Sequence, residues 1–182
     1  MIEYFKTLDH ALFEFFNQET SNSVFDFLMP IVTDERFLVG AMLILVLFVG
    51  FKYKKRGWIV VGFAILALGI SDLLCAQILK PFFGRIRPSH IEGFGNLLVA
   101  KGGKLSFPSN HAANAFAASV ILQYIFNTRG KILLFSTAAV IAFSRIYVGV
   151  HYPVDVLAGA IFGTFLGFCA LLILKKKMEK LF

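Results

Sequence analysis

Cysteine is scarce in this sequence: Cys75 and Cys169 are the only two, and each lies inside an apolar run. Thiols in such places act as small buried apolar side chains, so we expect neither a disulfide framework nor a zinc site. Charged residues make up only 16% of the chain, which leaves too little polar sequence for a separate soluble domain. Acidic residues also interrupt the apolar N-terminus, which argues against a signal peptide.

Apolar residues dominate instead. They make up 58% of the 182 residues, and the mean hydropathy is +0.75. Several runs approach the roughly 20 residues that a helix needs to cross a membrane. We therefore predict one all-α membrane domain over residues 1–182, with a polytopic bundle of about five spans at 37–174. The predicted spans cover residues 37–51, 57–79, 107–126, 132–150 and 154–174.

The first 34 residues have a different pattern. Between residues 2 and 16, apolar side chains recur at helical spacing, with charged side chains among them. This pattern is typical of an amphipathic helix that lies in the membrane interface. Residues 23–33 are too short to span a membrane and contain Pro30, so we predict a second short or re-entrant helix there. Residues 1–34 thus form predicted interfacial helices that precede the bundle.

The net charge of +7 comes mostly from Lys and Arg that flank the apolar runs. These cations lie in residues 52–56, 129–131 and 175–180. Such flanking cations mark the cytoplasmic side of a membrane protein, so no nucleic-acid partner is expected. With five spans the three segments all fall on one side. We therefore predict the inner membrane of a bacterium, with residues 80–106 on the periplasmic or outer side.

Three glycines of the last predicted span, Gly159, Gly163 and Gly167, are four residues apart. A stripe of small residues at this spacing lets two helices pack closely. Because the bundle is small, we expect the stripe to pack within the chain rather than between chains. The oligomeric state is left open.

Polar residues gather in three clusters on the predicted outer side. The clusters are KPFFGRIRP at 80–88, FPSNH at 107–111 and SRIYVGVHYPVD at 144–155. Lys80, Arg87 and Arg145 supply cations for a dense anion, and the planar fork of arginine suits phosphate oxygens. Ser109 adds a hydroxyl donor. The third and fifth predicted spans both begin on this side, so we expect both to direct free N–H groups toward the same anion site.

Two histidines, His111 and His151, add the groups that phosphoryl transfer needs. The reaction requires a nucleophile and a proton donor for the leaving oxygen. Asp155 follows His151 by four residues. A carboxylate at that position can hold one ring nitrogen of His151 and leave the other free to attack.

The clusters carry a family resemblance. Residues 80–88 match the pattern K-x6-R-P, residues 108–111 resemble P-S-G-H, and residues 144–155 fit S-R-x5-H-x3-D. In this order they resemble the type 2 phosphatidic acid phosphatase superfamily, which also includes vanadium haloperoxidases. The three motifs cover residues 80–155 of the chain.

The resemblance implies a role for each matching residue. His151 would be the nucleophile that forms a phosphohistidine, Asp155 would orient it, and His111 would protonate the leaving group. The phosphoryl oxygens would be held by Lys80, Arg87, Ser109 and Arg145. The family needs no metal and no other cofactor for this reaction.

One position departs from the family pattern. Asn110 stands where the family usually has glycine, which puts a close backbone contact there in doubt. Its side-chain amide could instead donate to the phosphoryl group. Arg85 lies outside the motif positions and is not a predicted site residue. Asp72, in the second predicted span, matches no motif and is left open between a structural and a functional role.

We therefore expect a membrane enzyme, a lipid phosphatase that acts at the outer face on the headgroup of a membrane lipid. A polyprenyl diphosphate, the 1-phosphate of lipid A, phosphatidate and phosphatidylglycerol phosphate are all compatible substrates. The alternatives are an anion transporter and a non-catalytic protein that binds lipid phosphates. Charges clustered at one face rather than along a path argue against the transporter, and the presence of both histidines argues against the binding protein.

Overall fold

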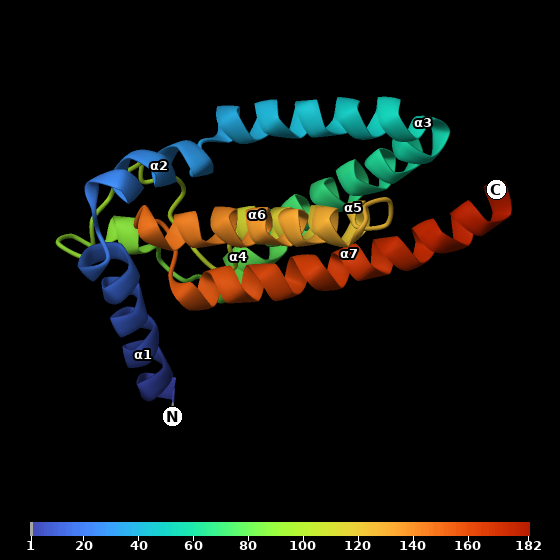
Figure 1. The fold of residues 1–182 in the computed structure, drawn as a ribbon. Helices are drawn as coiled ribbons and strands as arrows, with labels where there is room; N and C mark the ends of the chain where they lie inside the picture. The colour runs from blue at the N-terminus through green and yellow to red at the C-terminus, as the bar shows by residue number, and fades with distance from the viewer. Residues whose placement is uncertain (1) are drawn as a thin grey trace.

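The computed structural model describes residues 2–182, and helices make up most of that range (Figure 1). The helices, in chain order, are α1 (Ile2–Glu14), η1 (Phe15–Glu19), α2 (Ser23–Thr33), α3 (Glu35–Leu74), η2 (Cys75–Leu79), α4 (Lys80–Phe83), η3 (Pro88–His90), α5 (Asn110–Leu122), α6 (Thr128–Tyr147) and α7 (Pro153–Leu181). Over residues 2–182 the sole extended pairing is an isolated bridge between Ile86 and Leu105. The predicted all-α fold is confirmed.

The first two predicted spans are the two arms of α3. The helix folds back on itself at Lys54, whose backbone has φ 51° and ψ −133° (Figure 1). The arms come close together just after the kink, because a Cβ on Gly57 would lie 2.2 Å from the carbonyl oxygen of Val49. Glycine is therefore required at position 57. The loop predicted at 52–56 is in fact a kink centred on one residue.

The structure does not confirm five spans. Three helical stretches are long and apolar enough to cross a membrane: the folded-back stretch Glu35–Phe83, Thr128–Tyr147 and Pro153–Leu181. The span predicted at 107–126 is instead α5, which has 13 residues and a length of about 20 Å. This length is too short for a hydrocarbon core of about 30 Å.

Helix α5 packs against α3, α6 and α7, with its most extensive contacts to α7. The glycine stripe forms this last contact. A Cβ on Gly163 would lie 1.9 Å from the carbonyl oxygen of Ala113, and one on Gly159 would lie 2.4 Å from that of Ser109. The expectation that the stripe packs within the chain is confirmed. Of the two cysteines, Cys75 is buried as expected, but Cys169 is exposed.

The N-terminal segment, defined here as residues 2–33, lies across one end of the bundle (Figure 1). Both predicted short helices are present in it, as α1 and α2. Asn17, which is 1% exposed, fastens the segment to the bundle. Its side-chain amide donates to the carbonyl oxygens of Tyr147 and Asn96, at 2.7 Å each. The carbonyl of the same amide accepts from the Asn96 N–H at 2.6 Å.

The basic segments lie together at the other end, where the α3 kink, the α5–α6 turn and the C-terminus are found (Figure 1). The guanidinium of Arg56 lies 4.5 Å from the ring centroid of Phe182. Tyr53 and Phe126 have ring centroids 6.1 Å apart. The three basic segments thus share one end of the molecule, as the sequence predicts, although the prediction relied on a span count that the structure does not confirm.

Candidate active site

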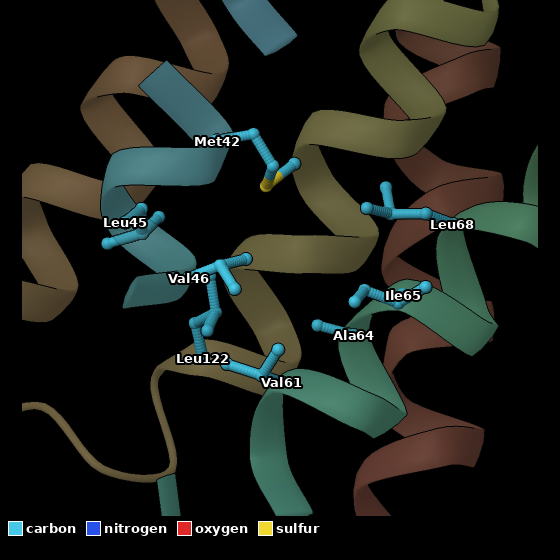
Figure 2. A pocket seen from close by; sticks show the side chains of 8 residues that line it. All are labelled: Met42, Leu45, Val46, Val61, Ala64, Ile65, Leu68 and Leu122. Atoms are coloured by element: carbon cyan, nitrogen blue, oxygen red, sulfur yellow. The ribbon is translucent and has the colours of Figure 1, made fainter. Parts of the chain in front are cut away.

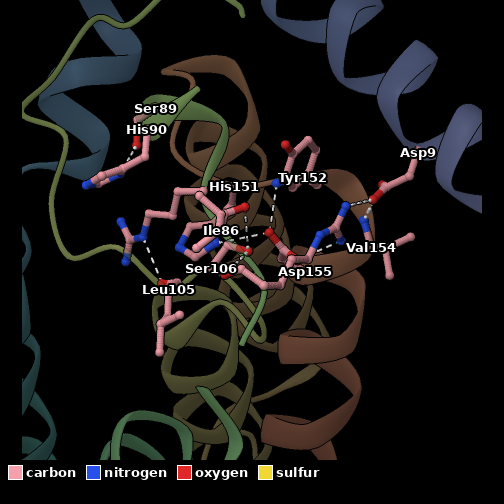
Figure 3. Close-up of polar contacts among 12 residues, drawn as sticks. Asp9, Ile86, Ser89, His90, Leu105, Ser106, His151, Tyr152, Val154 and Asp155 are labelled. Atoms are coloured by element: carbon pink, nitrogen blue, oxygen red, sulfur yellow. Dashed lines mark hydrogen bonds and ion pairs between the residues drawn. The ribbon is translucent and has the colours of Figure 1, made fainter. Parts of the chain in front are cut away.

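The three polar clusters meet at the end of the bundle that the N-terminal segment covers. Figure 3 shows the part of this meeting point around His151, Tyr152 and Asp155. Lys80 begins α4, Ser109 precedes α5, and Arg145 lies in the last turn of α6. His151 lies in the turn between α6 and α7, close enough to Lys80, Arg87 and Arg145 for their charges to act on it. The same three cations and His151 act on His111, in the first turn of α5. The predicted histidines and cations therefore form one cluster.

His151 is buried, with 1% of its surface exposed. Its backbone N–H donates to the carbonyl oxygen of Arg145 at 3.2 Å. Burial, together with the positive charges of Arg87, Arg145 and Lys80, lowers the pKa of His151 well below its ordinary value. The imidazole is therefore neutral near pH 7, and one ring nitrogen has a free lone pair.

Asp155 lies beside His151 in the first turn of α7, as the motif predicts. Its Oδ2 is 3.5 Å from Nδ1 of His151, which is longer than an ordinary N–H···O hydrogen bond of about 2.7–3.2 Å. The same oxygen accepts from the backbone N–H of Tyr152 at 2.9 Å. Oδ1 accepts from Nη1 of Arg85 at 2.9 Å. Asp155 is thus held firmly by groups other than the histidine.

Three buried polar atoms in the cluster lack a hydrogen-bond partner within residues 2–182. They are Nδ1 of His151 and two donors, the hydroxyl of Ser109 and Nε of Arg145. Buried polar groups in native proteins nearly always have a partner, so this pair of donors suits a polar ligand. Arg145 also donates through Nη1 to the Thr33 hydroxyl, and Nε of Arg87 donates to the carbonyl oxygen of Leu105 at 3.0 Å. An anion is the ligand that these donors and cations fit.

Only one of the two helix N-termini that we expected to face the anion does so. The start of α5 lies in the cluster, next to Ser109 and His111. At the start of α7, however, the Val154 N–H donates to Oδ1 of Asp9 at 2.9 Å. Asp9 is an acidic residue of α1, and it occupies a donor that we had expected to face the anion. The prediction is therefore wrong for the Val154 N–H.

Asn110 is directed elsewhere than the sequence predicts. Its side-chain amide donates to Oδ1 of Asp72 at 2.7 Å, and that of Asn114 lies 3.5 Å from the same oxygen. The amide of Asn110 is thus paired with a carboxylate of α3 instead of being free for a phosphoryl oxygen. This contact also assigns Asp72 a structural hydrogen-bonding role between α3 and α5.

Sequence reasoning missed four residues that contact the cluster: Asp9, Thr33, Arg85 and Ser106, which is fully buried beside Asp155 and His151. Arg85 lies two positions before Arg87, inside the first cluster, and this placement was the one available signal for it. Asp9 and Thr33 lie in the N-terminal segment, 76 and 112 residues from their arginine partners. Nothing in their local sequence distinguishes them from ordinary polar residues of an interfacial helix.

A separate pocket lies between the arms of α3 and the end of α5 (Figure 2). Its lining includes Met42, Val46, Val61 and Leu122 and is wholly apolar, so it offers nothing to an anion. Within the described part of the chain, no group of three or more His, Cys, Asp or Glu side chains is placed to hold a metal ion. The polar cluster is therefore the candidate active site.

Comparisons with known proteins identify relatives of the chain. The chain is 34% identical over 189 aligned positions to a lipid A 4′-phosphatase of Bacteroides thetaiotaomicron, an alignment that covers 100% of this chain and 83% of the relative. The crystal structure of Aquifex aeolicus LpxE superimposes with a TM-score of 0.73 at 29% identity, covering 88% of this chain and 93% of that one.

A second solved structure is that of a transmembrane PAP2-type phosphatidylglycerolphosphate phosphatase from Bacillus subtilis. It superimposes with a TM-score of 0.73 at 26% identity, and 97% of this chain and 87% of that chain are covered. The family model for the PAP2 superfamily matches residues 58–179, which include the whole polar cluster except the residues of the N-terminal segment. The chain therefore belongs to the PAP2 superfamily, as the three motifs predicted.

Proposed function

We propose that the protein is a membrane lipid phosphatase that hydrolyses the phosphate ester of a lipid headgroup through a phosphohistidine. The observation that carries this proposal is a buried, neutral His151 among three cations and two unpaired buried donors. A neutral imidazole is a nucleophile, and the cations and donors stabilise the negative charge of the phosphoryl group during transfer.

The proposed reaction has two steps. Burial and the nearby positive charges lower the pKa of His111 to about 3, and the negative charge of a bound phosphate opposes this shift, so His111 enters the reaction as an imidazolium. Nδ1 of His151 faces Asp155, so Nε2 attacks phosphorus, the bond from phosphorus to the lipid oxygen breaks, and the His111 imidazolium gives its proton to that oxygen. In the second step His111 takes a proton from water as the water oxygen attacks phosphorus. The bond between phosphorus and nitrogen then breaks, which releases inorganic phosphate and restores His151.

The residues that bind the phosphoryl oxygens are proposed to be Lys80, Arg87, Ser109 and Arg145. Each of them lies in the cluster, and Ser109 and Arg145 present the unpaired atoms. Asn110 is not part of this proposal, because its amide is bonded to Asp72. All steps use side chains of this chain alone, so the proposed reaction is metal-independent.

The substrate is proposed to be a lipid with a phosphate monoester. The similarity to a lipid A 4′-phosphatase, which extends over the whole of this chain and 83% of the relative, makes a lipid A phosphate the first substrate to test. The similarity to a phosphatidylglycerolphosphate phosphatase makes that lipid the second. A polyprenyl diphosphate completes the panel.

The test measures phosphate release from this panel by the purified protein in detergent containing EDTA. We expect turnover of at least one lipid phosphate, unchanged by the chelator. Trapping of an acid-labile phosphoryl-enzyme is then compared between the wild type and three variants. We expect none for His151→Ala and a slower accumulation for Asp155→Asn, whose histidine is less well oriented.

For His111→Ala, the defect should shrink with an aryl phosphate, whose leaving group needs little protonation. Trapped phosphate on His151→Ala would contradict the assignment of the nucleophile. An aryl phosphate that is hydrolysed no better than a lipid phosphate by His111→Ala would contradict the assignment of the acid.

We further propose that the cluster faces the periplasm from a bacterial inner membrane. The support is that the basic segments gather at the opposite end of the molecule, and such segments mark the cytoplasmic side. In a background with Cys75→Ala and Cys169→Ala, an impermeant thiol reagent should label Lys101→Cys on intact cells and leave Arg129→Cys unlabelled. The reverse pattern would show that the orientation is inverted.

A further inference from the structure

Arg85 contacts both a proposed catalytic residue and the N-terminal segment. Its Nη1 donates to Oδ1 of Asp155 at 2.9 Å, and its Nη2 donates to Oδ2 of Asp9 at 2.5 Å. Its guanidinium also lies over the ring of Tyr152, 4.0 Å from the centroid. One arginine therefore joins α1 to the first turn of α7, and Figure 3 labels the two carboxylates that it joins, Asp9 and Asp155.

Asp9 is buried in this contact, and both of its carboxylate oxygens accept hydrogen bonds. It is 3% exposed, and both of its oxygens are used, one by Arg85 and the other by the Val154 N–H. Burial of a carboxylate is costly unless it is paired with a cation and hydrogen-bonded, and Asp9 meets both conditions. The two carboxylates of this network are buried, and the side chain of Arg85 that joins them is only 25% exposed, so the network differs from an ordinary surface ion pair.

The charges of the network have a consequence for His151. If Arg85 faced Asp155 alone, its positive charge would compensate the carboxylate and weaken its attraction for the imidazole. Asp9 supplies a second negative charge, so the two carboxylates and the one guanidinium carry a formal net charge of −1. This net charge favours the positive charge that His151 gains when it attacks phosphorus.

We propose that Arg85 and Asp9 are positioning residues, which fix the orientation and the effective charge of Asp155 and thereby the ring of His151. Helix α1 would then be a functional part of the active site, although it lies outside the region that the family model matches. The inference rests on the roles proposed above for Asp155 and His151.

The kinetic test uses Arg85→Gln and Asp9→Asn, with the lipid phosphate that the wild type turns over fastest. Removal of a group that orients a metal ligand typically costs about 10- to 100-fold in activity, and we expect a loss of similar size in kcat here. KM should change by less than about threefold, because neither residue is placed to touch the phosphate. Arg85→Lys should recover little, since one ammonium cannot reproduce the planar fork that joins two carboxylates.

Glu14→Gln is the matched control. It removes one negative charge from α1, as Asp9→Asn does, but Glu14 is exposed. We expect wild-type kcat and KM. A kcat within about twofold of wild type for both Arg85→Gln and Asp9→Asn would overturn the proposal, and if Arg85→Gln does not fold, Asp9→Asn decides by itself.

The pH profile separates positioning from a merely structural role. Asp9→Asn leaves the charge of Arg85 uncompensated, so the acid limb of kcat/KM should move to lower pH. Arg85→Gln removes a cation, so the same limb should move to higher pH. The other charged or titratable groups that face His151 are the same in both variants: Lys80, Arg87, His111, Arg145 and Asp155. Shifts in the same direction would contradict the charge argument.

A last measurement does not depend on turnover. Hydrogen exchange of residues 2–14 should become faster in Arg85→Gln and stay unchanged in Glu14→Gln, because only the first variant releases α1 from the site. If the wild type hydrolyses no lipid phosphate, the proposed function fails, and the exchange result still decides whether Arg85 fastens α1. Unchanged exchange in Arg85→Gln would overturn that anchoring.

Discussion

Two regions of the molecule hold the candidate active site by different physical means. The contact between α5 and α7 consists of small residues, and Gly163 lies so close to Ala113 that a Cβ would be 1.9 Å from its carbonyl oxygen. The N-terminal segment adds buried polar side chains to its apolar contact through Phe13, whose ring centroid lies 5.5 Å from that of Tyr152. Asp9, Asn17 and Thr33 are 3%, 1% and 4% exposed.

The two kinds of contact have different effects on the site: helix packing sets where its residues lie, and polar contacts set the orientation and charge of single side chains. Close helix packing fixes the positions of backbones, because a packed interior resists displacement. It brings Ser109 and Asp155 into contact, with the Ser109 N–H 3.0 Å from the Asp155 carbonyl oxygen. Polar contacts fix individual side chains and their charges. We therefore expect changes at the glycines to abolish the fold and changes in the N-terminal segment to alter function or stability by smaller steps.

The largest effect is expected from Gly163→Leu, which tests the contact between α5 and α7. Its side chain has no space, since the nearest atoms belong to the backbone of Ala113 and cannot rotate away. The helices would have to separate, and we expect no stably folded monomer by size exclusion in detergent. Gly69→Leu on α3 is the control, because nothing lies within 4 Å of its Cβ position. A folded Gly163→Leu protein would contradict the conclusion that the fold depends on close packing of α5 against α7.

Arg145→Lys should give the next largest effect, with the fold intact. Loss of a donor aimed at a developing negative charge costs about 100- to 1,000-fold in kcat, and a single ammonium cannot replace two parallel N–H bonds. Thr33→Val sharpens the comparison, because it removes only the hydroxyl with which the N-terminal segment contacts Arg145. We expect it to lower kcat far less than Arg145→Lys. Near-normal turnover by folded Arg145→Lys would show that the arginine fork does not bind the phosphoryl group.

The sequence identifies the site residues of the helical bundle but not those of the N-terminal segment. The motifs single out Lys80, His111, His151 and Asp155, and the structure brings these residues together, while their roles in the reaction stay predictions. Their meeting point follows from helices that begin or end at one side of the bundle.

Asp9 and Thr33 could not be assigned, since helical periodicity shows which face is apolar and not which polar side chain another element will bury. The length of α5 was overestimated for a related reason. Apolar composition continues from Phe107 to Phe126, but the helix begins only at Asn110, and the Asn127 side chain already caps α6 by accepting from the Gly130 N–H at 3.0 Å. Hydropathy does not register such ends.

Asn17→Ala tests the attachment of the N-terminal segment apart from catalysis. The substitution leaves the buried carbonyl oxygen of Tyr147 without the amide that donates to it at 2.7 Å. Each unsatisfied buried group costs about 1–3 kcal/mol, so we expect a clear fall in the thermal midpoint in detergent. Gln18→Ala, at the exposed neighbouring position, should change the midpoint little. Equal midpoints for the two variants would contradict the attachment through Asn17.

The smallest effect is expected from Tyr147→Phe, which removes one polar contact at the edge of the N-terminal segment. The hydroxyl donates to Oδ1 of Asp26 at 2.6 Å and accepts from the Asn22 N–H at 3.1 Å. The ring is fully buried and stays in place, so the change removes hydrogen bonds without leaving a cavity. A typical hydrogen bond contributes about 1 kcal/mol, and one to a carboxylate about 1.5–3 kcal/mol. Since Asp26 remains partly accessible to water, we expect a loss near the lower value.

The measurement for Tyr147→Phe is the thermal midpoint together with kcat. The midpoint should fall by less than in Asn17→Ala, and kcat should stay within about twofold of wild type, because this contact supports α2 rather than the groups around His151. Tyr124→Phe provides the control, as that tyrosine is 38% exposed. A large loss of kcat with an unchanged midpoint would contradict this expectation. It would mean that the contact between Tyr147 and α2 positions the active site, as we propose for Asp9 and Arg85.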